Sequence, residues 1–97
     1  MLEIKVPETY PFNPPFIRVI RPRFAFRTGH VTIGGSICTE LLTDSGWSPA
    51  NTVEAVLVNI RANLLAGGAR IDFANKHDYT EHEAKDAFER MRQQHGW

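Results

Sequence analysis

The stretch LEIKVPETYPFNPPFIRVI, residues 2–20, decides the first half of the fold. Residues 2–6 alternate apolar and polar side chains, a pattern typical of a half-buried strand, and Pro7 ends the strand because proline has no amide hydrogen to donate. Three prolines among residues 11–15 predict a stiff connection. Residues 16–20 are aromatic and β-branched enough for a second strand, so we expect the two strands to pair as an antiparallel ribbon.

The sequence predicts a helix over about 52–65. Asn51 and Glu54 match the capping-box pattern, in which two side chains bind free backbone amides at the start of a helix. Gly67 and Gly68 then end the helix, because glycine takes the left-handed conformation that often closes one. The residues that fall on one apolar face are Val53, Val56, Leu57, Ile60 and Leu64.

A second helix is predicted near the end of the sequence. Thr80 and Glu83 form another capping-box pattern, and Gly96 closes the helix. This helix is weaker in apolar content than the first, and its apolar residues are Ala84, Ala87, Phe88 and Met91.

Length and composition limit the class of protein. Ninety-seven residues allow one domain, and eleven basic against eleven acidic side chains leave no global field to attract nucleic acid or an anionic membrane. No apolar stretch approaches the roughly 18 residues of a membrane span, and the first ten residues do not resemble a secretory signal. A single cysteine excludes an intramolecular disulfide and a thiolate zinc site, so we expect a reducing cytoplasmic or nuclear location and no metal.

The segment from Phe24 to Gly46 shows no sustained hydrophobic period. Long irregular backbone inside a compact domain is more often functional than idle, and Cys38 lies within it, at the end of GGSIC, residues 34–38. We expect the two glycines there to free the backbone for approach to a substrate. A lone cysteine is by default a small buried hydrophobic residue, and a nucleophile is the alternative.

The four histidines do not settle the role of Cys38. A Cys-His peptidase pair with any of them is a further alternative, but no spacing singles one out, and such peptidases need a larger scaffold. The histidines are too scattered for a metal site, and they are His30, His77, His82 and His95.

Trp47 precedes Ser48, Pro49, Ala50 and the first predicted helix. We expect its ring to pack the loop onto the start of that helix. An exposed Pro-Ala tip on a rigid loop would also suit a docking surface.

Three motifs in one order closely resemble the catalytic core of ubiquitin-conjugating enzymes. They are YPFNPP at residues 10–15, GSIC at 35–38 and WSPA at 47–50, and a helix follows. The family has a Tyr-Pro-x-x-Pro-Pro elbow, a Gly-x-Ile-Cys nucleophile and a Trp-Ser-Pro-Ala loop in that order. The glycine pair before Cys38 and ARIDF at 69–73 resemble the divergent Q-type branch.

The resemblance implies one α+β domain over residues 1–97, in which an antiparallel β-meander packs on helices. Such domains ordinarily begin with a helix and two further strands that this sequence lacks, so the resemblance implies an N-terminally truncated domain. The strand at 2–6 would then expose unpaired backbone groups, and we expect the isolated chain to self-associate through that edge.

The resemblance also implies an activity. Cys38 would accept ubiquitin from an activating enzyme as a thioester and pass it to a substrate lysine or a ligase. The expected partners are therefore ubiquitin, an activating enzyme and a ligase. No cofactor is expected, because the activating enzyme uses the ATP. The alternative is a non-catalytic ubiquitin-binding or scaffold variant of the same fold.

Two further catalytic residues are carried over by position. The family's oxyanion donor is an asparagine eight residues before the cysteine, in a His-Pro-Asn motif that is absent here, and His30 stands in its place. An acidic residue that faces the incoming lysine falls at Asp72. The ligase-binding surface is expected to comprise Phe24 or Phe26, Trp47, Pro49 and Ala50.

Overall fold

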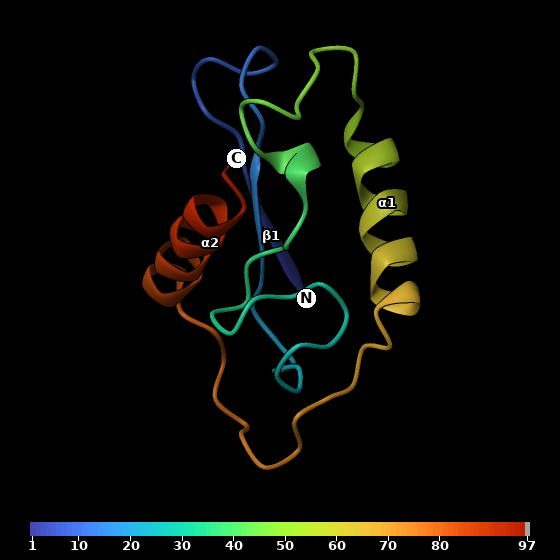
Figure 1. The fold of residues 1–97 in the computed structure, drawn as a ribbon, viewed down its shortest axis with the longest axis vertical. Coiled ribbons are helices and arrows are strands. Elements are labelled where there is room, and N and C mark those ends of the chain that lie inside the picture. The colour runs from blue at the N-terminus through green and yellow to red at the C-terminus, as the bar shows by residue number, and fades with distance from the viewer. Residues whose placement is uncertain (97) are drawn as a thin grey trace.

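The computed structural model describes residues 1–96, and Figure 1 shows a small sheet between two helices. The strands are β1 (Leu2–Lys5) and β2 (Phe16–Val19), and a short 3-10 helix, η1, spans Glu40–Leu42. The helices are α1 (Val53–Ala66) and α2 (Glu81–His95), and they lie on opposite sides of the strands. This architecture confirms the α+β class. Neither helix of the described chain has the length and apolar character needed to cross a bilayer.

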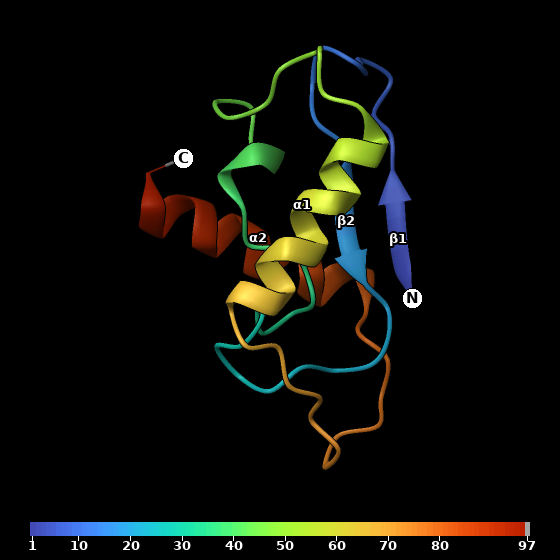
Figure 2. The same cartoon turned by 90° about the vertical axis from the view of Figure 1, so that its right-hand side faces the viewer.

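β1 and β2 pair as the predicted antiparallel ribbon, with Leu2 opposite Val19 and Lys5 opposite Phe16. β1 forms the outer edge of the sheet (Figure 2). Residues 35–37 lie along the other edge of β2, because Gly35 accepts a hydrogen bond from the Val19 amide at 2.7 Å. The described residues thus contain two strands of a meander and, in the third position, a segment joined to β2 by an isolated bridge.

The core lies between the sheet and α1. Its centre contains Ile17 of β2, Ile37 of the bridged segment, and Val56 and Ile60 of α1, all buried. Tyr79, which precedes α2, joins the same cluster. The residue before Cys38 is therefore fixed in the core.

α1 matches the predicted helix to within a residue at each end, but its cap differs. The N-cap is Thr52, whose hydroxyl accepts a hydrogen bond from the Ala55 amide at 3.1 Å. The prediction of an Asn51 capping box was wrong. Thr52 has the extended backbone of a cap, and its side chain binds the free Ala55 amide. Gly67 follows as the C-cap.

α2 begins and ends as predicted. The Thr80 hydroxyl accepts from the Glu83 amide, the Glu83 carboxylate accepts from the Thr80 amide, and Gly96 takes the left-handed conformation at φ 71°. The inner face carries Ala84, Ala87 and Met91, all buried. Because two of these three side chains are small, α2 packs close to the chain beneath it.

Candidate active site

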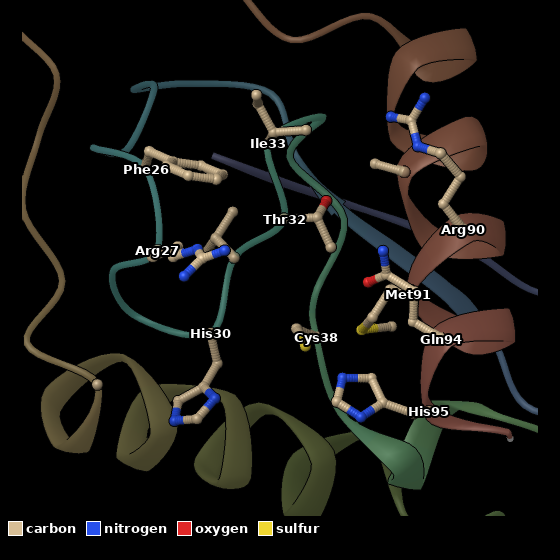
Figure 3. A pocket seen from close by; sticks show the side chains of 13 residues that line it. Phe26, Arg27, His30, Thr32, Ile33, Cys38, Arg90, Met91, Gln94 and His95 are labelled. Carbon is tan, nitrogen blue, oxygen red and sulfur yellow. The ribbon is translucent and has the colours of Figure 1, made fainter.

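Cys38 is half-buried and lies directly after the bridged segment, at a cavity of about 440 Å³. The Cys38 amide donates a hydrogen bond to the His30 carbonyl at 2.7 Å, so the two residues lie side by side on neighbouring segments of the chain. Figure 3 shows the cavity between the loop that carries Phe26 and His30 and the helix α2. His30, eight residues before Cys38, therefore lies beside it along the backbone.

The loop that faces Cys38 has an unusual backbone. Arg27 and His30 both have positive φ, 61° and 57°, which is uncommon for residues other than glycine and is often found at functional sites. Gly29 between them also has a positive φ, and its amide donates to the Gly67 carbonyl at 3.0 Å. The Thr28 hydroxyl closes the turn with a hydrogen bond to the Ala25 carbonyl at 2.8 Å. These contacts fix the loop against the end of α1.

The His30 ring lies on the α1 side of the cavity. Figure 3 shows the ring directed towards α1, and a Cβ atom added at Gly67 would lie 2.9 Å from its Cδ2 atom. Gly67 thus provides the space that the ring occupies. The structure brings the backbones of His30 and Cys38 together while the imidazole rests over the helix end.

The two glycines before Cys38 do not face a substrate, contrary to the prediction. A Cβ atom at Gly34 would lie 2.1 Å from the Glu83 carbonyl oxygen of α2, and one at Gly35 would lie 2.5 Å from the Tyr79 ring. Both glycines are buried. They are required because the chain before Cys38 packs directly on the backbone of α2 and on an aromatic ring.

The surroundings of Cys38 act on its ionisation through burial. Desolvation raises the pKa of the Cys38 thiol above its ordinary value, because burial disfavours the charged thiolate. None of the described residues that line the cavity is acidic. The thiol is therefore protonated in nearly all molecules at neutral pH.

Asp72 lies outside the Cys38 cavity. It lines a separate cavity of about 430 Å³ with Arg21 and Phe73. Its amide donates to the Arg23 carbonyl at 2.8 Å, and its carboxylate accepts from the Ala74 amide at 3.1 Å. These are the contacts of a turn, and the structure does not bring Asp72 together with Cys38 in one cavity.

The five residues expected to bind a ligase are dispersed. Phe26 is 67% exposed beside the Cys38 cavity, at the end of α1 where Gly29 meets Gly67. Pro49 and Ala50 are exposed and precede the other end of α1. A helix of this length spans about 20 Å, which separates them from Phe26.

The two remaining aromatic residues of that set are inside the fold. Phe24 is half-buried, and its amide donates a hydrogen bond to the Tyr79 hydroxyl at 2.8 Å. Trp47 is 8% exposed and donates from Nε1 to the Pro11 carbonyl at 2.8 Å, with its ring 6.2 Å from that of Tyr10. Trp47 thus holds the proline elbow and supports the neighbouring loop from within.

Sequence reasoning missed two parts of the cavity lining, namely Arg27 and the residues of α2. Arg90, Met91 and Gln94 line the cavity, with Ala87 one turn before them. The signal was the helical spacing, which puts these side chains on one stripe beside the buried Met91. Arg27 carried no comparable signal. Among the described residues, no group of three or more His, Cys, Asp or Glu side chains could hold a metal ion.

The chain belongs to the ubiquitin-conjugating enzyme family, whose sequence model matches residues 1–95. Its whole length is 41% identical, over 101 residues, to ubiquitin-conjugating enzyme E2 Q1 of Homo sapiens and covers 24% of that protein. It is also 41% identical, over 103 residues, to ubiquitin-conjugating enzyme E2 Q-like protein 1 of Homo sapiens, of which it covers 63%. These similarities confirm the resemblance to the Q-type branch, and the chain spans only part of each relative.

Proposed function

We propose that this chain transfers ubiquitin through a thioester at Cys38. It would accept ubiquitin from an activating enzyme and pass it to a substrate lysine or to a ligase. The observation that carries the proposal is the position of Cys38, which is the one thiol of a family member and lies at a cavity beside His30. A cysteine that served only packing would need no such opening.

Charging of Cys38 is an exchange between thioesters. The Cys38 thiolate attacks the ubiquitin carbonyl carbon, a new carbon–sulfur bond forms, and the activating enzyme's sulfur leaves as a thiolate that takes up a proton. Because burial raises the pKa of the Cys38 thiol, only a small fraction is reactive at any moment. Charging should therefore be slow at neutral pH and faster in mildly alkaline buffer.

Discharge onto lysine needs a neutral amine and a donor for the oxyanion. The amine attacks the thioester carbonyl, the Cys38 sulfur leaves, and the proton lost by the amine passes to the thiolate or to water. The proposal gives the donor role to His30, whose imidazole carries an N–H in either protonation state. Because Asp72 lines a different cavity, the proposal does not place it against the acceptor lysine.

Ligase contact is proposed at the exposed tip formed by Pro49 and Ala50, with Trp47 fixing the tip from the interior. Substituting Pro49 and Ala50 should lower ligase-stimulated discharge while charging stays normal. Unchanged stimulation would remove this surface from the proposal.

A thioester assay tests the function. With activating enzyme, ubiquitin and ATP, the wild type should form an adduct that a thiol reductant removes. Cys38→Ser should form a slower adduct that resists the reductant, since an oxygen ester replaces the thioester, and Cys38→Ala should form none. An undiminished reductant-sensitive adduct in Cys38→Ser would contradict the assignment.

A non-catalytic ubiquitin-binding role is the second candidate. Two observations favour it: burial raises the pKa of the Cys38 thiol, and the His30 ring is directed towards α1. Under this alternative, ubiquitin binds the uncharged protein and no adduct forms even at high pH. The same assay, with a binding titration beside it, separates the two roles.

A further inference from the structure

The cavity at Cys38 concentrates positive charge in a chain that is neutral overall. Arg27 from the loop and Arg90 from α2 lie on opposite sides of Cys38 (Figure 3). No acidic side chain of residues 1–96 lines the cavity. Since the chain has eleven basic and eleven acidic residues, this charge is a local feature.

The Arg90 guanidinium is available for a ligand. Within residues 1–96 it makes no hydrogen bond or ion pair. Of the carboxylates nearest to it along the helix, Glu89 pairs with Arg92, and Asp86 makes no ion pair with Arg90 and has an oxygen 3.3 Å from His82 Nε2. Nothing in the described chain neutralises this side of the cavity.

The Arg27 guanidinium is exposed in the same way. Its recorded contact is with the Phe26 ring, 5.2 Å from the ring centre, which leaves its N–H donors open. The bond between Gly29 and Gly67 fixes the backbone of the loop that carries Arg27, and the Arg27 side chain lines the cavity. By contrast, Arg18 on the sheet is tied to the Glu3 carboxylate.

We propose that Arg27 and Arg90 select acceptors that carry an anionic side chain close to the acceptor lysine, and this inference rests on the proposed function. The planar guanidinium matches a carboxylate or a phosphate, with paired N–H donors. A lysine approaches Cys38 as a cation and is repelled by the two arginines. A neighbouring glutamate or phosphoserine offsets that repulsion and positions the acceptor peptide in the cavity.

Discharge onto matched peptides tests the selection. The two peptides of the first pair each contain a single lysine, and the residue beside it is Glu in one peptide and Gln in the other. In a second pair that residue is phosphoserine in one peptide and serine in the other. With charged wild type, the anionic peptide should have a KM lower by about fivefold, the size expected of an exposed ion pair, and kcat should change little. Arg27→Gln and Arg90→Gln should each reduce this preference to below about twofold. Arg61→Gln removes an exposed charge of α1 outside the cavity and should leave the preference intact.

A binding titration keeps the inference separate from the activity. The same peptides, labelled with a fluorophore, are titrated with uncharged protein at low and high salt. Preferential binding of the Glu peptide that is lost in Arg90→Gln and weakened by salt would support the inference even if no thioester formed. Arg90→Glu should reverse the preference towards a peptide with lysine in place of the glutamate. Equal binding and equal KM for the Glu and Gln peptides would overturn the inference, while an absent thioester alone would overturn only the proposed function.

Discussion

Replacing Gly34 with alanine tests whether close packing on α2 holds the Cys38 segment. Gly34 is not among the glycines with positive φ, so its backbone suits alanine and the perturbation is one of space. The new Cβ atom would lie 2.1 Å from the Glu83 carbonyl oxygen and 2.9 Å from the Ala87 Cβ atom. The first of these is backbone and cannot rotate away, so α2 must move.

The size of the effect follows from that overlap. Ordinary contacts begin at 3.4 Å, so α2 would have to retreat by more than 1 Å. Overpacking of this kind costs about 1–3 kcal/mol, and the reduced freedom of the unfolded chain returns roughly 0.5 kcal/mol. We expect the free energy of unfolding to fall by about 1.5 kcal/mol, which lowers Tm by roughly 6–12 °C in a domain of this size.

Urea unfolding, followed by the fluorescence of the buried Trp47, measures the loss. Alkylation of Cys38 is the second readout, because a displaced α2 opens the cavity and should speed the reaction. Gly68→Ala is the control: nothing lies within 4 Å of its Cβ position, and its positive φ costs only about 1 kcal/mol without moving α2. A loss below about 0.5 kcal/mol in Gly34→Ala, with unchanged alkylation, would refute the packing argument.

Four further predictions concern ionisation, catalysis and assembly. Because burial raises the pKa of Cys38 above 9.0, its alkylation rate should rise about tenfold per pH unit from neutral pH to pH 9.0; a plateau below pH 9.0 would contradict this. In single-turnover discharge to free lysine, His30→Ala should be slower by about 10²- to 10³-fold with charging intact and His30→Asn active, whereas a loss under about threefold would make His30 only a loop residue. Hydrogen bonds from Lys5 and a second lysine lower the pKa of Glu81 to about 2. The ionised Glu81 carboxylate therefore stabilises the fold above pH 4.5, and this stabilisation is lost as the pH falls towards 2. In an NMR titration Lys5→Gln should raise the pKa of Glu81. Light scattering should show association that grows with concentration through the edge of β1, and a monomeric mass at all concentrations would exclude it.

The parts of the fold that depend on local signals were predictable. Alternation and prolines determine β1 and β2, and the capping box of Thr80 determines α2, because each signal acts within a few residues. The cap of α1 shows the limit of such signals. Asn51 and Thr52 are both good caps, and the choice between them depends on the backbone angles that the preceding loop imposes.

The sequence drew attention to Cys38 and His30, but it did not predict the residues that line the cavity around them. The family motif drew attention to Cys38 and the eight-residue spacing to His30, and the Cys38 amide does donate a hydrogen bond to the His30 carbonyl. The role of Gly34 was misjudged because it depends on a contact with Glu83, far away in sequence. For the same reason the hydrogen bond from Trp47 to Pro11 was not predicted, although the packing of the Trp47 ring inside the fold was. A glycine that admits a substrate and one that admits a helix look alike in a sequence.

The ionisation of Cys38 also bears on what the arginines do. A guanidinium held against the sulfur would stabilise the thiolate and lower the pKa of the thiol. The pKa is raised instead, and desolvation is its cause, so Arg27 and Arg90 act little on the sulfur although they line the same cavity. Both arginines line the cavity, so their charge acts on whatever enters it. Under the proposed function that space would receive the acceptor, so we expect the two arginines to affect the choice of acceptor more than the rate of charging.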